Sequence, residues 1–516
     1  MKYLLHSTLT FSAPSRAILY DEAEKLAKNG HEVYVLYCGR SLNVCYTNMN
    51  GDTKKCTFCT ANYQFYDRIN ISSKVKFISL KESLEDGMIS NNLGMKFHYE
   101  NVNDIKNIKY KNVNIGYACL SSYISFSRNL YPLIDDSFKV YFDNLLRNSC
   151  LMCDLIEVLL IQYKPDFIYG YNGRFLDSRP TWEFSKSQGV HFALLEAQYT
   201  FSYYNKIVFY NDTPHSIASI NKNLILEIWD HSNLGLDEKI TLATEFYERR
   251  KKALPSGDKI YTKNQKQGLL PKGWDSTKKN IVIFLSSEDE FIAIGDEFEK
   301  YSIFSSQIEG INDIAEFFLH NQQIQFYVRI HPNLSDIDYS YHKKIYELEK
   351  FANVKVIEPK SIISSYSLID NSDTVVVFGS TIGIEAVYWG KPTILLSWAV
   401  YYYLDCCYIP SSKEEVFELI NTHLVPKDKL GTYKFGLTYH DSVGQVCEFV
   451  DCNCKNYTFK IFGYRKTITL NNWEKLFGSR FLFFALRAFL NLPLKLYCSF
   501  MKFGPVYQVP TREIEY

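Results

Sequence analysis

The sequence lacks an excess of charge of either sign, and this absence excludes one class of partner. Its 516 residues contain 57 Lys and Arg against 57 Asp and Glu, so no global field is available to hold a polyanion such as nucleic acid. No segment offers the roughly 20 uninterrupted apolar residues that cross a bilayer. We therefore expect neither a nucleic-acid-binding protein nor an integral membrane protein.

A secretion signal is also missing from the N-terminal segment. The apolar stretch after Met1 is short and is broken by His6 and Ser7, which is typical of a first β-strand rather than of a signal peptide. We therefore expect a protein of the reducing cytoplasm, in which the 13 cysteines do not form a disulfide framework.

The chain is too long for one compact core, because 516 residues exceed the roughly 150 residues of an average domain. Short β-rich runs such as HEVYVLYC alternate with helical stretches, which predicts parallel strands joined by crossover helices. Segment 251–279 is rich in Lys, Gly and Pro, and we interpret it as a linker. We expect an α/β fold with two Rossmann-like doubly wound lobes, residues 1–250 and 280–460, followed by an amphipathic helical tail, 461–516.

Polar side chains follow the strands of the second predicted lobe where each strand ends. Ligands of doubly wound sheets bind at this edge, and hydroxyl, His, Lys and Arg groups there suit a phosphate. Taken singly, each residue also fits a helix cap, a turn or a solvated surface position. The expected phosphate-side residues are Ser286, Ser287, Arg329, His331, Lys360, Ser380 and Thr381.

The stretch VVVFGSTIGIEAVYWGKPTILL, residues 375–396, has this pattern in full. A buried strand breaks at Gly379 into a helical pattern, and such a turn presents hydroxyl and N–H groups to an anion. Glu385 lies in the predicted helix, where its carboxylate suits two hydroxyls of a ribose. The alternative is a plain strand-helix-strand unit in which the glycine only closes a bend.

Three stretches together carry a resemblance to a known family. They are SSEDEF (286–291), RIHPNL (329–334) and SSYSLIDNSDTVVVFGSTIGIEAVYWGKP (364–392). They resemble the nucleotide-sugar domain of bacterial surface-polysaccharide glycosyltransferases with the GT-B fold, including the capsule-type group with His-Pro and Ser-Thr motifs. The resemblance covers roughly residues 280–412.

The resemblance implies a nucleotide-sugar donor and catalysis without a metal ion. In this family the motif residues hold the nucleotide phosphates and a helix carboxylate meets the ribose; here those residues are His331, Ser380, Thr381 and Glu385. The His-Pro and Ser-Thr motifs tilt the donor toward a CMP-linked acidic sugar, while UDP- and GDP-linked sugars stay open.

The first half supplies candidates for the other reactant. The run DFIYGYNGRF places Asn172 and Arg174 at a strand end, and HFALLE places Glu196 at the end of the next strand. An inverting transfer needs a carboxylate that takes a proton from the acceptor hydroxyl. Glu196 is our first choice for this base and Asp177 the second, with His331 acting on the donor side.

Cys38, Cys45, Cys56 and Cys59 fall within one polar segment after the second predicted strand. Four thiols suit a tetrahedral structural zinc or an iron–sulfur cluster, which would order a long loop. The spacing is not the paired C-x-x-C arrangement, so free structural thiols are the alternative.

The tail has a basic face. Its polar residues fall within one sector of a helix, with Phe, Leu and Met around the remainder, and they are Arg480, Arg487, Asn491, Lys495 and Lys502. Such a helix suits an anionic membrane surface, although packing on the first lobe is an equal alternative.

These patterns favour a cytoplasmic glycosyltransferase, peripheral at the inner membrane, that moves a sugar to a surface-polysaccharide acceptor, which we expect to be lipid-linked. Two other functions stay open. One is a nucleotide-sugar 2-epimerase, which needs no acceptor, and the other is a non-catalytic scaffold of glycan assembly.

Overall fold

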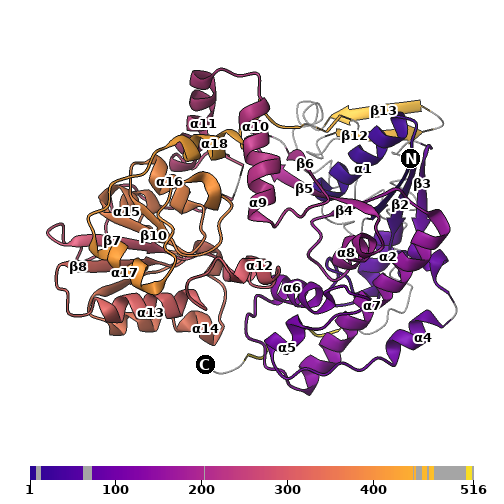
Figure 1. Cartoon of the computed structure of the whole chain (residues 1–516), viewed down its shortest axis with the longest axis horizontal. Helices are drawn as coiled ribbons and strands as arrows, with labels where there is room; N and C mark the ends of the chain where they lie inside the picture. The colour runs from indigo at the N-terminus through magenta and orange to yellow at the C-terminus, as the bar shows by residue number, and fades with distance from the viewer. Residues whose placement is uncertain are drawn as a thin grey trace.

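The computed structural model of the chain has two α/β lobes side by side (Figure 1). It describes residues 1–6, 13–61, 73–85, 87–202, 204–257, 259–445, 447–448, 456–461, 464–469 and 507–513. No helix within these ranges has both the length and the hydropathy to cross a bilayer. The five residues of the predicted basic face, Arg480 to Lys502, lie outside the described residues, so the tail helix stays a prediction.

The first lobe is built on a sheet with strand order β3-β2-β1-β4-β5-β6. These strands are β1 (Lys2–His6), β2 (Glu32–Tyr37), β3 (Val75–Ser79), β4 (Phe167–Tyr171), β5 (His191–Tyr199) and β6 (Tyr204–Tyr210). Its helices are α1 (Ala13–Lys28), α2 (Thr53–Ala61), α4 (Met88–Leu93), α5 (Val102–Lys106), α6 (Ile115–Ser127), α7 (Asp136–Tyr163) and α8 (Arg179–Ser187). Neighbouring strands are parallel except β6, which pairs antiparallel with β5.

Both faces of this sheet are covered, which explains why its strands are nearly continuous apolar runs. Leu4 of β1 packs in a core with residues of α6 and α7, whereas its neighbour Leu5 packs in a second core with residues of α1. Side chains alternate between the two faces of a strand, so each face needs its own apolar set.

The second lobe has a parallel sheet with strand order β11-β10-β7-β8-β9. Its strands are β7 (Lys279–Phe284), β8 (Ile324–Arg329), β9 (Val354–Ile357), β10 (Thr374–Val377) and β11 (Thr393–Leu395). Its helices are α12 (Asp296–Glu299), α13 (Gln307–Phe317), α14 (Ser340–Lys343), α15 (Ser365–Asn371), α16 (Ile382–Tyr388), α17 (Lys413–Asn421) and α18 (Leu430–Leu437). Because the strands are parallel, the predicted strand ends meet at one edge.

Three helices connect the lobes: α9 (Ile217–Ile220), α10 (Glu227–His231) and α11 (Leu236–Lys251). The last of them packs on the second lobe. The Tyr247 hydroxyl donates to the carbonyl oxygen of Thr432 at 2.6 Å, and its ring stacks on Tyr388 with 4.0 Å between centroids. The linker follows α11, and its described residues before β7 form no helix or strand.

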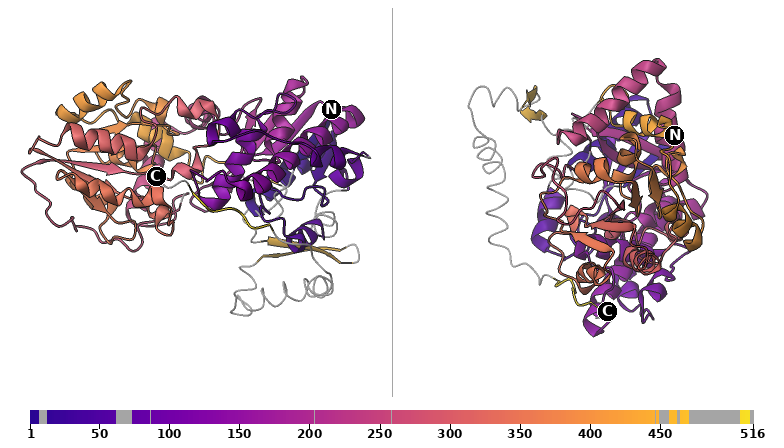
Figure 2. Two further views of the ribbon diagram at one scale, coloured as in Figure 1. Left: turned by 90° about the horizontal axis from the view of Figure 1, so that it is seen from below. Right: turned by 90° about the vertical axis from the view of Figure 1, so that its left-hand side faces the viewer.

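Residues 507–513 lie across both lobes (Figure 2). The N–H of Tyr507 donates to Asn50 in the first lobe at 2.7 Å, and the Glu513 carboxylate accepts from the N–H of Ser340 in the second lobe at 2.6 Å. Between them, the carbonyl of Arg512 accepts from the N–H of Leu133 at 3.0 Å. A hairpin of β12 (Asn456–Ile461) and β13 (Tyr464–Thr469) precedes this segment.

The predicted α/β fold with two Rossmann-like lobes is confirmed by this topology. The antiparallel strand β6 was not predicted, because the loop that turns the chain back after β5 has no strong turn signal. The domain limits at residues 250 and 280 stay predictions.

Candidate functional site

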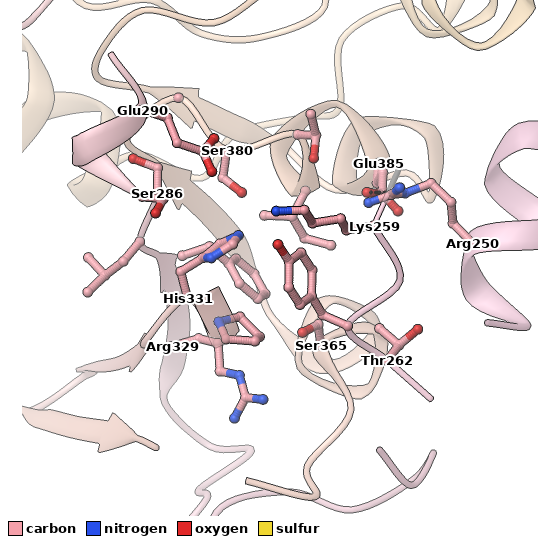
Figure 3. A pocket seen from close by; sticks show the side chains of 18 of the residues that line it. Arg250, Lys259, Thr262, Ser286, Glu290, Arg329, His331, Ser365, Ser380 and Glu385 are labelled. Atoms are coloured by element: carbon pink, nitrogen blue, oxygen red, sulfur yellow. Dashed lines mark hydrogen bonds and ion pairs between the residues drawn. The ribbon is translucent and has the colours of Figure 1, made fainter. Parts of the chain in front are cut away.

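A cavity of about 370 Å³ lies at the carboxyl edge of the second sheet (Figure 3). The turns after β7, β8 and β10 form one side of it, and the linker residues Lys259, Tyr261 and Thr262 form another. The cavity is lined by six of the residues predicted on the phosphate side and by the predicted ribose carboxylate: Ser286, Ser287, Arg329, His331, Ser380, Thr381 and Glu385. The structure thus brings together seven side chains from three separated segments of sequence.

The turn after β10 needs a glycine at its first position. Gly379 has φ +98°, which an L side chain rarely adopts, and a Cβ there would lie 2.2 Å from the carbonyl oxygen of Trp398. The Tyr401 hydroxyl donates to the carbonyl oxygen of Ser380 at 2.5 Å and so fixes the bend. The turn can therefore keep the hydroxyls of Ser380 and Thr381 at the cavity wall.

His331 follows β8 and points toward the middle of the cavity, as does Lys259 (Figure 3). Its Nδ1 accepts a hydrogen bond from the backbone N–H of Asn333 at 3.2 Å. A neutral imidazole carries its proton on one nitrogen, so this contact favours the proton on Nε2. The edge of the Tyr261 ring packs on the imidazole at 5.2 Å, which limits its rotation.

Arg329 has a buried guanidinium that is already bonded to the protein. It donates to the carbonyl oxygens of Glu358 at 2.8 Å and Ser361 at 3.3 Å, so it fixes the turn after β9. Burial lowers the pKa of Arg329 to about 10, and the side chain therefore stays cationic at neutral pH. It contributes positive charge beside the cavity rather than an exposed hydrogen-bond donor.

Both oxygens of Glu385 are bonded within the protein. Oε1 lies 2.8 Å from Nε of Arg250 on α11, and Oε2 accepts from the Tyr366 hydroxyl at 2.5 Å. The Glu385 side chain is fully buried. Its predicted contact with a ribose would therefore require the Arg250 side chain to give way, and the ribose role stays a prediction.

Lys360 lies outside the cavity lining. Its Nζ forms an ion pair with Asp336 at 2.8 Å, and both side chains are largely exposed. The reason is its place in the sheet, because β9 is the edge strand and the turn after it faces solvent rather than the centre of the edge. The solvated alternative given for this residue fits its position.

The acceptor-side candidates lie in the first lobe, also outside this cavity. Glu196 accepts from the Tyr171 hydroxyl at 2.6 Å and from Nδ2 of Asn172 at 2.9 Å. Burial raises the pKa of Glu196, which makes its carboxylate a better proton acceptor. Oδ1 of Asn172 in turn contacts Nε2 of His215 at 3.1 Å. Asn172 therefore holds the carboxylate from a position with φ +60°, which non-glycine residues seldom adopt.

Arg174 and Asp177 differ from Glu196 in exposure and contacts. Nη2 of Arg174 donates to Ser125 Oγ at 3.2 Å, and Nη1 donates to the carbonyl oxygen of Glu290, a residue that lines the cavity. Asp177 is 1% exposed, at the start of α8. Glu196 is the more accessible of the two carboxylates, so the geometry favours it over Asp177 as the base.

The structure does not form the predicted cysteine metal site. Among the described residues, no group of His, Cys, Asp and Glu is arranged to hold a metal ion. Cys38 Sγ accepts from the N–H of Leu42 at 3.4 Å, and Cys56 Sγ accepts from Asn48 at 3.2 Å. Burial raises the pKa of the Cys38 thiol to about 11, so it keeps its proton.

Packing orders this segment instead of a metal. Leu42, Val44 and Met49 are buried in the core of the first lobe, and α2 carries Cys56 and Cys59. The spacing of cysteines along the chain could not reveal these contacts. Cys447, by contrast, is disulfide-bonded.

The buried carboxyl of Glu288, next to the cavity, predicts a pH dependence of stability. Burial raises its pKa from 4.5 to about 7, and Oε1 accepts from the N–H of Gln307 at 3.1 Å. A raised pKa means that the folded state binds the proton more tightly, so the stabilisation is complete below pH 4.5 and is lost as the pH rises through 7. We expect the free energy of unfolding to fall by about 1–3 kcal/mol between roughly pH 5 and 8 through this group.

Urea unfolding of the native protein and Glu288→Gln at both pH values checks this prediction. His6 and His215 have pKa values lowered by burial, and they oppose the trend, so the difference between the two proteins isolates Glu288. Equal pH dependence in both would contradict the prediction.

Part of the chain matches one family of known proteins in sequence. Residues 276–404 match the family model described as "Capsule polysaccharide biosynthesis protein". This segment is similar to that family, and it makes up about a quarter of the chain. The predicted resemblance to capsule-type proteins is confirmed for residues 276–404, which span β7 to β11 and most of the cavity lining. No curated protein matches the chain in sequence.

Solved structures show more distant likeness. KpsC of Thermosulfurimonas dismutans, a beta Kdo 2,4 transferase, matches with 13% identity and a TM-score of 0.33 over 59% of this chain and 85% of that chain. The UDP-GlcNAc 2-epimerase of Neisseria meningitidis bound to UDP-GlcNAc matches with 12% identity and a TM-score of 0.25 over 86% of this chain and 96% of that chain.

Several residues that line the cavity were not predicted from sequence. Lys259 and Tyr261 come from the linker, whose composition only indicates a lack of regular structure. Arg250 lies on α11, and Glu290 and Trp398 complete the wall. The sequence offers one signal for Lys259: it is a cation in a segment between two predicted lobes, and the cleft of a two-lobed enzyme lies between its lobes.

Proposed function

We propose that this protein is a glycosyltransferase that moves a sugar from a nucleotide-sugar donor to a capsule polysaccharide acceptor. One observation carries the proposal: the cavity that gathers hydroxyls, His331 and cationic side chains at the carboxyl edge of β7, β8 and β10 has most of its lining in the segment that matches the capsule family. A doubly wound sheet binds its ligand at this edge, and these side chains suit a phosphate.

On the donor side, the chemical problem is the negative charge on the departing nucleotide phosphate. Nε2–H of His331 and the amine of Lys259 both point toward the middle of the cavity and would donate to phosphate oxygens. The Ser380 and Thr381 hydroxyls add donors from the opposite turn. Stabilising this charge as the bond to the sugar breaks lowers the barrier to transfer.

On the acceptor side, Glu196 takes the proton from the attacking hydroxyl. The hydroxyl oxygen forms the new bond to the anomeric carbon, the bond to the phosphate oxygen breaks, and the proton passes to the Glu196 carboxylate. Its raised pKa and its fixed position between Tyr171 and Asn172 support this role. A single displacement of this kind inverts the configuration at the anomeric carbon.

The identity of the donor and the place of the reaction belong to the same proposal. A CMP-linked acidic sugar is our first choice for the donor, with UDP- and GDP-linked sugars next. A lipid-linked acceptor would place the protein at the cytoplasmic face of the inner membrane, with the predicted basic face from Arg480 to Lys502 against the lipid.

Nucleotide binding is the first test. CMP, UDP and GDP are screened separately by thermal unfolding, because a ligand that binds only the folded state stabilises it by about 2.7 kcal/mol at a hundred times its Kd. We expect one nucleotide to raise Tm by several degrees. The double variant Ser380→Ala/Thr381→Val should lose this shift, whereas Lys360→Ala, outside the cavity, should keep it. A shift unchanged in the double variant would contradict the assigned site.

The reaction itself is tested with the matching nucleotide-sugar. We expect free nucleotide to accumulate only when a capsule-type acceptor is added. If the nucleotide-sugar alone is converted to its epimer, the transferase hypothesis is wrong and the protein is a nucleotide-sugar 2-epimerase.

A further inference from the structure

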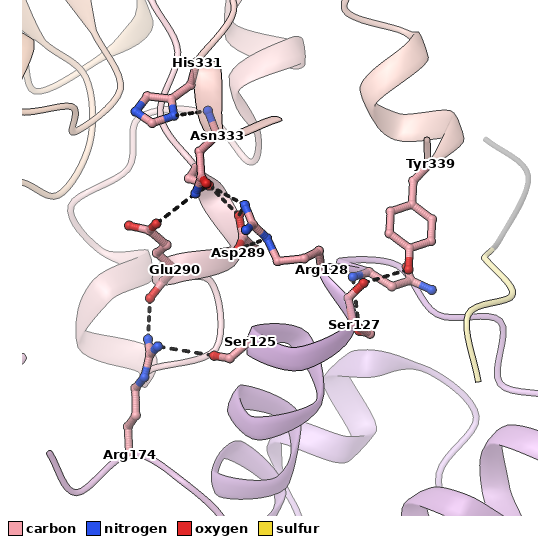
Figure 4. Close-up of polar contacts among 11 residues, drawn as sticks. Ser125, Ser127, Arg128, Arg174, Asp289, Glu290, His331, Asn333 and Tyr339 are labelled. Atoms are coloured by element: carbon pink, nitrogen blue, oxygen red, sulfur yellow. Dashed lines mark hydrogen bonds and ion pairs between the residues drawn. The ribbon is translucent and has the colours of Figure 1, made fainter. Parts of the chain in front are cut away.

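Polar contacts join the first lobe to the loop beside His331 (Figure 4). Arg128 follows α6 in the first lobe, and its Nη2 donates to Ser287 Oγ at 2.9 Å and to Asp289 Oδ1 at 3.0 Å. The guanidinium also forms an ion pair with the Asp289 carboxylate, which is 7% exposed. Arg128 therefore holds the loop after β7 from across the lobe boundary.

The loop passes this contact to Asn333, in the turn after β8. Nδ2 of Asn333 donates to Ser287 Oγ at 3.2 Å and to Glu290 Oε1 at 3.2 Å, so both of its protons are used. The Ser287 hydroxyl donates to Asp289 Oδ1 at 2.7 Å, which leaves its oxygen to accept from Arg128 and Asn333. These bonds fix the position of Asn333.

The backbone of Asn333 in turn determines how His331 presents itself. Its N–H donates to Nδ1 of His331, as described above, and so keeps the ring proton on Nε2. With the proton on Nε2 the ring donates to a phosphate oxygen, whereas the other tautomer would present a lone pair to that oxygen. The orientation of one backbone N–H thus decides whether the ring attracts or repels a phosphate.

Two more contacts keep the lobe boundary in register. Arg174 donates to the carbonyl oxygen of Glu290, and the Tyr339 hydroxyl donates to the carbonyl oxygen of Ser127 at 2.8 Å (Figure 4). Arg128 and Arg174 of the first lobe therefore contact the 287–290 loop at its two ends.

We propose that Arg128 is a positioning residue for His331: through Ser287 and Asn333 it fixes the histidine tautomer that donates to a phosphate, and it does so only when the two lobes lie together. The donor site is then complete only with the acceptor-side lobe in place. The inference rests on the proposed function for the role of His331, but the contacts and their effect on the ring can be tested without it.

The test is the tautomer of His331 in full-length protein. Histidine is labelled with ¹⁵N, long-range ¹H–¹⁵N spectra are recorded near pH 8, and the His331 signals are assigned by their loss in His331→Ala. We expect the native ring to be protonated on Nε2, and Arg128→Ala to shift both ring nitrogens toward the average of the two tautomers. Unchanged nitrogen shifts in a folded Arg128→Ala protein would overturn the proposal.

A matched variant separates this effect from general loosening of the lobes. Lys106 also crosses the boundary, through an ion pair with Glu299, but it has no contact with the 287–290 loop. Lys106→Ala should leave the His331 signals as they are, and an equal shift in this variant would also overturn the proposal. If Arg128→Ala does not fold, Arg128→Lys and Asn333→Ala take its place, because either removes part of the same chain of contacts.

Activity gives a second readout once the donor is known. Misplaced catalytic groups commonly cost one to two orders of magnitude, so we expect Arg128→Ala to lower kcat by about 10- to 100-fold and also to raise the nucleotide Kd, because the ring no longer donates to the phosphate. A combined Arg128→Ala/Asn333→Ala variant should lose little more than the larger single effect, since both act through one path. A tautomer that responds in a protein without nucleotide affinity would sink the proposed function and leave the positioning role standing.

Discussion

Replacing Glu196 by Gln should lower sugar transfer by about 10²- to 10⁴-fold while nucleotide binding is retained. Gln has the same shape as Glu but cannot take the proton of the acceptor hydroxyl. Glu196 is held by the Tyr171 hydroxyl and the Asn172 amide and does not line the donor cavity, so its loss should act on the chemical step and not on donor affinity. The measurement is kcat at saturating acceptor, together with the Kd of the nucleotide.

Asp177→Asn is the matched control for this prediction. Asp177 is the second carboxylate considered for the base, yet it is 1% exposed. We expect its replacement to change kcat far less than Glu196→Gln does. A large loss in Asp177→Asn with an active Glu196→Gln would assign the base to Asp177, and full activity in both would remove either carboxylate from the reaction.

Removing the carboxylate of Glu385 should destabilise the folded protein by about 3–5 kcal/mol, because it leaves the Arg250 guanidinium without its buried partner. The Glu385 side chain is fully buried and that of Arg250 is 13% exposed, so water replaces the lost contact poorly. The Tyr366 hydroxyl loses its acceptor in the same step. Equilibrium urea unfolding of Glu385→Ala gives the change in free energy.

The neighbouring Lys251 provides the comparison. It pairs with Asp370 at 3.0 Å, but the two side chains are 25% and 43% exposed. Such surface pairs contribute at most about 1 kcal/mol, so Lys251→Ala should cost far less than Glu385→Ala. The double variant Arg250→Met/Glu385→Leu should recover part of the loss, since it leaves no buried charge. Equal costs for the two single variants would contradict a buried, stabilising pair.

Local sequence predicted the parts of the site that depend on local structure. Gly379 breaks a buried strand and His331 precedes a proline, so both stood out as turns at strand ends, and both line the cavity. The fold could be predicted because apolar strands alternate with helices along the chain. A parallel sheet that is covered by helices on both faces has this pattern.

The remaining features depend on contacts between distant segments, which one sequence does not contain. Arg128 lies just beyond the end of α6 and has a φ of +62°. Nothing in the sequence around it indicates a partner 159 residues away. The position of Lys360 depended on β9 being an edge strand, and strand order is a property of the assembled sheet. The spacing of the four cysteines suggested a metal site, but it gave no sign that the apolar residues between them fill the core.

The linker forms one wall of the donor cavity, and this affects how the two lobes could be recombined with those of related enzymes. A junction placed between Tyr261 and Lys279 would separate Lys259 and Tyr261 from the strand ends that they face. α11 is bound to the second lobe through Tyr247 and Arg250, so it would need to travel with that lobe. A chimaera joined before Leu236 would keep the cavity lining together, but it would replace Arg128, so the incoming lobe would need an equivalent contact to the loop after β7.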